Sequence, residues 1–254
     1  MIKDLRRLKA SVMLSILLLT SNNARAYATN GNGELPFNIT TDGNPMYYEE
    51  LYNSLNDLPE GIKLYLSQEN LNVLVLDEVD DAEYFYKKAH GYSFDGIIGF
   101  LWPRRNTIYV ESANVNYYDK NPDISLDYDK EEFNYMIVRD TLIHELGHFF
   151  DYKEGFKLSE SDEFKNIYDL ESKKYMETTH YKVDNLGVYL NIDSSLEYFA
   201  TAYACYIKYP EELKEKCPQT YEYIDNYMVN LNKEYSPNRE EKMNISVRTR
   251  RISR

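Results

Sequence analysis

One stretch near the middle of the chain combines a helical pattern with metal-binding side chains: Leu142-Ile143-His144-Glu145-Leu146-Gly147-His148. The two histidines are four residues apart, so on a helix both imidazoles project from the same face, about one turn apart. Two imidazoles in that arrangement can hold a single zinc ion, and the glutamate between them can take a proton from water without being a ligand. The sequence therefore predicts a zinc site with His144 and His148 as ligands and Glu145 as general base.

The residues around this motif indicate a helix that runs through the centre of a domain. The helical pattern starts near Lys130, and apolar side chains cover much of the helix surface: Tyr135, Ile137, Val138, Leu142, Ile143, Leu146, Phe149 and Phe150. Gly147 is a poor helix former, which costs up to about 1 kcal/mol relative to alanine. We therefore expect another segment to approach the helix closely at Gly147.

A hydrolytic zinc site commonly has three protein ligands and one open position for water, so a third ligand must come from elsewhere. Glu154 follows the first histidine by ten residues, but Asp151 stands where a glycine would break the helix. The continuing helix would carry Glu154 away from the metal face, and we reject it as a ligand. Glu197 lies beside an apolar stripe, where a carboxylate is costly to bury unless it is paired or metal-bound. From the residues alone, Glu197 is either the third ligand or a solvent-facing glutamate at the edge of the stripe.

Along the whole chain, strand patterns come first and helix patterns follow. Short apolar runs predict strands at Asn72–Leu76 and Thr107–Ser112. Periodic apolar residues predict helices at Met46–Leu58, Pro59–Gln68 and Asp81–His90. After a predicted loop over 114–129, the pattern is helical almost to Tyr235. This order is typical of an α+β domain.

The two ends of the chain differ in composition from its middle. Residues 1–26 have a basic start, an apolar stretch from Ala10 to Thr20 and the small-x-small pattern Ala24-Arg25-Ala26, which predicts a secretory signal peptide cleaved near Ala26. Residues 27–240 form one predicted domain, with an N-terminal α/β lobe to about residue 153 and a helical lobe after it. Residues 241–254 form a basic tail. The net charge of −13 disfavours nucleic acid and anionic membranes as partners.

Both cysteines, Cys205 and Cys217, lie in the predicted exported part of the chain. An oxidising compartment would allow a disulfide between them. Cys205 also fits an apolar helical pattern, so the alternative is a pair of buried thiols. Neither cysteine has the spacing of a metal ligand.

Three segments of the chain resemble the catalytic domain of anthrax-lethal-factor-like zinc peptidases: His144-Glu145-Leu146-Gly147-His148-Phe149-Phe150-Asp151, then Glu197-Tyr198-Phe199-Ala200, then the run from Cys217 to Ile224. That family includes the small secreted Pro-Pro endopeptidases of Gram-positive bacteria. The resemblance covers about Lys130 to Met228. It implies a zincin-like metallopeptidase fold of the α+β class, with a small mixed sheet packed on the active-site helix and a C-terminal helical subdomain.

The resemblance also implies roles for individual residues. Glu197 matches the glutamate ligand of the family, which completes the zinc site of the two histidines. Tyr189 is the nearest match to a tyrosine that hydrogen-bonds the oxyanion, although it stands eight residues before Glu197, one more than the family spacing. Thr201 stands where the family commonly has a further glutamate, and it can still accept a hydrogen bond. Asp151 either orients a ligand or is a polar residue near the helix end.

These expectations describe a secreted, extracellular zinc metalloendopeptidase that acts as a monomer on extracellular or surface proteins, with proline-rich sites as a hypothesis. Its catalytic residues would be Glu145 and Tyr189. An extended protein or peptide substrate would pair with Thr107–Ser112 as an edge strand. Trp102 either forms an aromatic wall for a proline ring or belongs to the core.

Two other functions stay open at this point. The chain could be a non-catalytic binding module on a zincin scaffold, since 26 tyrosines suit a protein interface. The intact general base in the histidine motif argues against that function. It could also be a toxin peptidase directed at host cells, although the chain leaves no room for a separate delivery domain.

Overall fold

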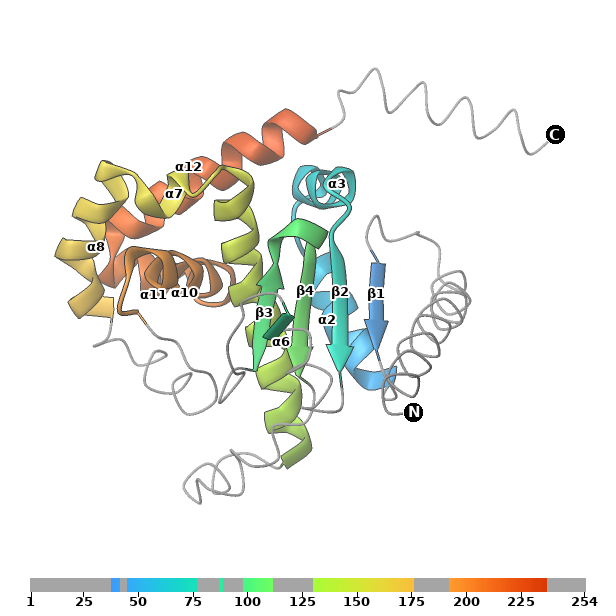
Figure 1. Ribbon diagram of the computed structural model, residues 1–254. Coiled ribbons are helices and arrows are strands. Elements are labelled where there is room, and N and C mark those ends of the chain that lie inside the picture. The colour runs from blue at the N-terminus through green and yellow to red at the C-terminus, as the bar shows by residue number, and fades with distance from the viewer. Residues whose placement is uncertain are drawn as a thin grey trace.

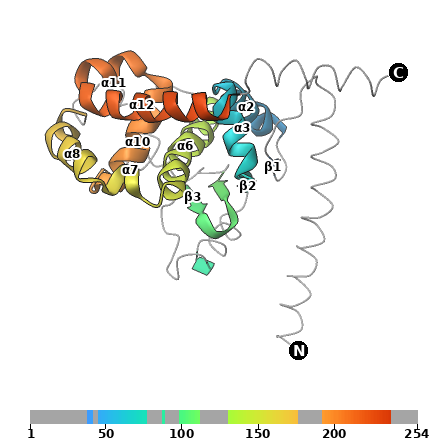
Figure 2. The same ribbon diagram turned by 90° about the horizontal axis from the view of Figure 1, so that it is seen from above.

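The computed structural model describes residues 38–41, 45–76, 87–88, 98–111, 130–175 and 192–236. These segments form a small sheet, a long helix packed against it and a group of C-terminal helices (Figures 1 and 2). The predicted signal peptide, the basic tail, the loop over 114–129, Tyr189 and most of the predicted helix Asp81–His90 lie outside the described residues. Within the described segments, no helix combines the length and hydropathy needed to cross a membrane.

The sheet has strands β1 (Asn38–Thr41), β2 (Asn72–Leu76), β3 (Gly99–Trp102) and β4 (Thr107–Glu111) in the order β1-β2-β4-β3. β2 is parallel to β1 and β4, and β3 is antiparallel to β4, so the sheet is mixed as predicted. The prediction that Thr107–Ser112 forms an edge strand is wrong. β4 lies between β2 and β3, and all five of its residues are buried.

A tight connection joins β3 to β4, and β3 itself was not predicted from the sequence. Pro103–Arg105 form a 3-10 turn, and Asn106 takes a left-handed conformation with φ 49° and ψ 43°, which asparagine tolerates better than most residues. The resulting register pairs Leu101 with Ile108. A strand of four residues shows too little periodicity to be recognised without its pairing partner.

Three helices come from the N-terminal half and the central motif: α2 (Pro45–Asn56), α3 (Glu60–Gln68) and α6 (Lys130–Lys153). They confirm the predicted helices with small shifts at the ends. α2 contacts β1, and α6 contacts β3 and β4. Alternate strand residues such as Val73, Val75 and Val110 join Leu142 and Leu146 of α6 in one apolar core.

The C-terminal part contains α7 (Lys157–Glu160), α8 (Asp162–Tyr175), α10 (Ser195–Lys208), α11 (Pro210–Lys216) and α12 (Pro218–Tyr235). α12 reaches back to α3, as Figure 1 shows. There the backbone N–H of Gly61 donates to Asn232 Oδ1 at 2.9 Å, and the rings of Tyr65 and Tyr235 meet edge to face. These features confirm the predicted α+β architecture, with a mixed sheet on the central helix and helices after it.

α10 packs directly against α6. A Cβ atom at Gly147 would lie 2.7 Å from Ala200 Cα, so glycine allows the two backbones to approach. The predicted close approach at Gly147 is therefore confirmed. About two helical turns away, the largely buried Lys208 ammonium pairs with Asp140 of α6. Together these contacts hold the first turns of α10 beside the histidine motif.

Candidate metal and catalytic site

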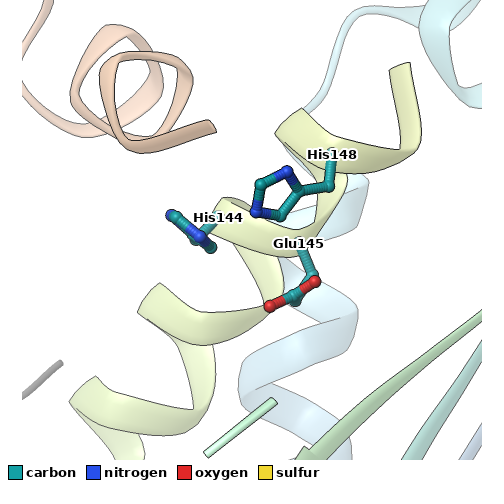
Figure 3. A group of neighbouring side chains, drawn as sticks. All are labelled: His144, Glu145 and His148. Carbon is teal, nitrogen blue, oxygen red and sulfur yellow. The ribbon is translucent and has the colours of Figure 1, made fainter. Parts of the chain in front are cut away.

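Two histidines project from the same face of α6. The ring centroids of His144 and His148 are 4.8 Å apart, and the ring planes are nearly perpendicular. Figure 3 shows both rings and the Glu145 carboxyl group side by side on this helix. One candidate ligand atom from each of the three residues lies within 4.8 Å of the other two. The helical spacing predicted from the sequence therefore produces the expected cluster.

Glu197 reaches the same cluster from the first turn of α10. Ser194 caps this helix, because its Oγ accepts a hydrogen bond from the Glu197 backbone N–H at 3.2 Å. In a complete capping box the glutamate side chain would turn back to the N-cap residue. Instead, Glu197 Oε2 lies 3.4 Å from His144 Nε2 and 3.5 Å from His148 Nε2. One helical turn further on, Thr201 Oγ1 lies 3.4 Å from His144 Nδ1, so the hydrogen bond considered for this threonine is present.

The spacing of these atoms fits a tetrahedral metal ion. Zinc binds imidazole nitrogen and carboxylate oxygen at about 2.0–2.1 Å, so two such ligand atoms on a tetrahedron lie about 3.3–3.4 Å apart. The Glu197 oxygen has close to this separation from each histidine nitrogen. Two imidazoles and one carboxylate also form a donor set that zinc accepts with a fourth position for water. The residues present therefore fit the predicted ion.

Charge interactions within the cluster favour an ionised carboxylate. Burial alone would raise the pKa of Glu197, but hydrogen bonds from His144 and His148 outweigh it and lower that pKa. Burial alone would lower the pKa of His148, but the carboxylates of Glu197 and Glu145 outweigh it and raise that pKa. A metal ion at this position would replace the protons on the histidine nitrogens that face Glu197, since metal binding requires deprotonated ligands.

Glu145 lies beside the centre in a different environment. Its side chain is buried, which raises the pKa of its carboxyl group, while His148 and His144 partly offset that increase. A carboxylate with a raised pKa is a better proton acceptor near neutral pH than an exposed one. Although Glu145 belongs to the cluster, Glu197 is the better third ligand because one of its oxygens contacts both Nε2 atoms.

Strand β3 supplies contacts to Glu145 that the sequence analysis missed. The backbone N–H of Leu101 donates a hydrogen bond to the Glu145 carboxylate. Gly99 lets the strand approach α6, since a Cβ there would lie 2.2 Å from Thr141 Cγ2 and 3.6 Å from Glu145 Cγ. In the sequence, the glycines at positions 91, 96 and 99 were the available signal. It could not identify the helix that the strand contacts.

Asp151 is not part of the centre. Its Oδ1 accepts hydrogen bonds from the backbone N–H groups of Leu158 and Ser159, at 3.1 and 3.0 Å, and its Oδ2 accepts one from the Ser159 hydroxyl. Asp151 therefore organises the turn into α7, and among the described residues no hydrogen bond joins it to His144 or His148. Glu154 accepts a hydrogen bond from the Tyr227 hydroxyl at 3.4 Å, away from the cluster, consistent with its rejection.

Trp102 lies half buried at the end of β3 and is not part of the main core cluster. The guanidinium carbon of Arg105 lies 4.6 Å from its ring centre, and the ring of Tyr109 on the neighbouring strand lies 6.1 Å from it. The residue is thus placed on the outer strand next to Leu101. Its role towards a substrate stays a prediction.

The two cysteines are buried thiols, and no disulfide joins them. Cys205 Sγ donates to the Tyr209 carbonyl oxygen at 4.0 Å, and Cys217 Sγ donates to the Glu171 carbonyl oxygen at 3.7 Å. Of the two alternatives, a disulfide or a pair of buried thiols, the structure contains the buried thiols. Each thiol has its own backbone acceptor.

The comparisons with known proteins cover the same region. A family model described as anthrax toxin lethal factor, N- and C-terminal domain, matches residues 114–227. Among solved structures, a Pro-Pro endopeptidase from Paenibacillus alvei is similar with 20% identity and a TM-score of 0.43, covering 76% of this chain and 96% of that chain. No curated protein matches the chain. The segment that carries His144, His148 and Glu197 thus resembles the anthrax-lethal-factor-like metallopeptidases, as its motifs predict.

Proposed function

We propose that this protein is a secreted zinc-dependent endopeptidase that hydrolyses peptide bonds in extracellular or surface proteins. The observation that carries the proposal is the meeting of His144 Nε2, His148 Nε2 and Glu197 Oε2 at the spacing of a tetrahedral site. The buried Glu145 beside them supplies the base that hydrolysis needs. The lethal-factor family match over residues 114–227 supports the same activity.

In the proposed mechanism, His144, His148 and Glu197 would hold the zinc ion, which when bound would supply the Lewis acidity that water and the scissile carbonyl need. Glu145 accepts the proton of the attacking water and then passes it to the leaving amine nitrogen. Its orientation is supported by the Leu101 N–H, which holds the carboxylate on the sheet side of α6. Tyr189 is the proposed hydrogen-bond donor to the oxyanion.

We further propose that the substrate binds as an extended strand along β3, in place of the strand Thr107–Ser112 expected first. β3 is an outer strand of the described sheet. The backbone N–H of Glu111 donates to the Ile98 carbonyl oxygen, so the alternate residues Gly99 and Leu101 direct their backbone groups away from β4. Because the Leu101 N–H contacts Glu145, the substrate would pair with the Gly99 backbone and the Leu101 carbonyl oxygen. Pairing on this side would place a substrate backbone next to Glu145.

The test uses purified protein that starts near residue 27. We expect bound zinc by elemental analysis and cleavage of a peptide library, both lost after treatment with a chelator and restored by zinc. Glu145→Gln should keep the zinc and lose at least about 100-fold in kcat, since a positioned base contributes that much or more. A Glu145→Gln protein as active as the parent would disprove the assigned mechanism. A parent that binds zinc but cleaves no peptide would favour the binding-module alternative.

Secretion and proline preference need separate measurements. Signal peptidase processing near Ala26 should place the mature protein in the culture supernatant, whereas detection inside intoxicated host cells would favour the toxin alternative. Library cleavage should be enriched for sites with proline next to the cut bond. Cleavage without such enrichment would reject the proline hypothesis and leave the peptidase activity standing.

A further inference from the structure

α10 contacts both nitrogens of one imidazole. Glu197 Oε2 lies 3.4 Å from His144 Nε2, and Thr201 Oγ1 lies 3.4 Å from His144 Nδ1. Glu197 and Thr201 are four residues apart, so they share one face of α10. Both ring nitrogens of His144 therefore contact side chains of the same helix. The sequence allowed a hydrogen bond from Thr201, and the structure identifies His144 as its partner.

Thr201 lies where the backbones of α10 and α6 approach each other closely. Thr201 is fully buried. The preceding residue, Ala200, touches Gly147 so closely that a Cβ on Gly147 would lie 2.7 Å from Ala200 Cα and 3.1 Å from Ala200 O. The two backbones therefore cannot shift independently at this point. The contact of 3.4 Å is long for a hydrogen bond, which suits an orienting role better than a large energetic one.

His148 differs from His144 in this respect. Its Nε2 atom also approaches Glu197, at 3.5 Å. Within the segments that the structure describes, no hydrogen bond to His148 Nδ1 is present, and the nearby Asp151 uses its carboxylate on Leu158 and Ser159. Among the described polar contacts with α10, His144 therefore touches two residues, whereas His148 touches Glu197 alone.

We propose that Thr201 is a positioning residue that keeps His144 in the tautomer with a proton on Nδ1. A neutral imidazole carries one N–H and one lone pair. If Nδ1–H donates to the Thr201 hydroxyl oxygen, the lone pair of Nε2 faces Glu197 and is available to zinc. Because the acceptor is a hydroxyl and not a carboxylate, it orients the ring without adding negative charge. This inference rests on the proposed zinc site.

The test compares Thr201→Val, which keeps the shape and removes the acceptor, with Thr201→Ser, which keeps the acceptor. Zinc affinity is measured by competition with a chelator. We expect Thr201→Val to bind zinc about 10- to 100-fold more weakly, and Thr201→Ser to bind within a few-fold of the parent. In the zinc-loaded protein, a slowly exchanging Nδ1–H resonance of His144 should be present in the parent and in Thr201→Ser, and absent from Thr201→Val.

Thr141→Val is the matched control. Thr141 is a buried threonine of α6 whose Oγ1 has no hydrogen-bond partner among the described residues, so its loss should leave zinc affinity unchanged. Equal zinc affinity in Thr201→Val and Thr141→Val would overturn the positioning role while leaving the zinc site intact. If Thr201→Val does not fold, Thr201→Ala takes its place with the same expected loss. A parent protein without zinc affinity would overturn the proposed function and this inference together.

Discussion

Two glutamates of the C-terminal helices place a carboxylate inside the protein and differ in their partners. Glu171 of α8 is fully buried, and its oxygens accept hydrogen bonds from the backbone N–H groups of Gln219 and Thr220 and from the Thr220 hydroxyl, at 2.8–3.2 Å. The carboxylate therefore caps the first turn of α12. Glu197 of α10 meets the Nε2 atoms of two histidines instead.

The difference shows how a structural carboxylate is distinguished from one that is proposed to bind a metal. The partners of Glu171 are permanent donors at a helix N-terminus, which stabilise the negative charge without any ion. The partners of Glu197 are imidazoles, which lose their donating protons when they bind a metal. Glu171 is fully buried and Glu197 partly exposed, so burial alone does not identify the candidate ligand. The chemistry of the partner atoms decides the function.

The largest expected effect comes from Glu197→Gln. An amide is a weak zinc ligand, so we expect zinc affinity to fall by more than about 100-fold and peptide hydrolysis to be lost with it. The metal-free protein should also unfold at a somewhat lower temperature than the metal-free parent, because the variant loses the pairing of the Glu197 carboxylate with the two histidines. Chelator competition and thermal unfolding provide the two measurements. Unchanged zinc binding in this variant would remove Glu197 from the ligand set.

Glu171→Gln should show the opposite pattern. The amide loses the charge and turns an NH2 group towards backbone donors, which we expect to cost about 2–3 kcal/mol of unfolding free energy. Zinc affinity of the folded protein should stay at the parental value. Urea unfolding together with zinc titration tests this expectation. A large loss of zinc affinity in the folded variant would show that the two carboxylates are coupled.

Gly147→Ala tests the contact that brings Glu197 and Thr201 to the histidines. The new Cβ would lie 2.7 Å from Ala200 Cα, which is backbone and cannot rotate away, so we expect α10 to be displaced at a cost of about 1–3 kcal/mol. Zinc affinity should fall as well, because Glu197 and Thr201 lie on α10. Differential scanning calorimetry and chelator competition measure the two effects.

Gly155→Ala serves as the control for a glycine substitution. Gly155 has φ +69°, and a Cβ atom added there would meet no other atom within 4 Å, so the expected cost of about 1–2 kcal/mol is conformational. Zinc affinity should not change. If both glycine variants lost zinc affinity in proportion to stability, the local role of Gly147 would be refuted.

The smallest effect is expected from Tyr203→Phe. The Tyr203 hydroxyl is buried and has no hydrogen-bond partner among the described residues, so its removal should be neutral or stabilise the fold by up to about 1 kcal/mol. Tyr198→Phe is the matched variant, because the Tyr198 hydroxyl bonds Thr220 Oγ1 at 2.8 Å in the Glu171 network. It should destabilise by about 1 kcal/mol. Urea unfolding curves for the pair decide whether that network stabilises the protein.

Features that depend only on local geometry were predictable from the order of the amino acids. A helix turns once every 3.6 residues whatever surrounds it, so the spacing of His144 and His148 was enough to place both rings on one face. The apolar run Asn72–Leu76 likewise predicted β2, and the glycine at 147 predicted a close contact. These features need no knowledge of distant residues.

Tertiary structure decided which distant residues meet. Glu154, Glu171 and Glu197 all lie in helical patterns, and packing of α10 against α6 selects Glu197. The antiparallel pairing of β3 makes β4 an inner strand, and Asp151 is occupied by Leu158 and Ser159. Such contacts arise from side-chain packing between segments far apart in the chain, which a periodic pattern in one segment does not encode. Long-range packing, and not local spacing, thus brought the Glu197 carboxylate to the two histidines of α6.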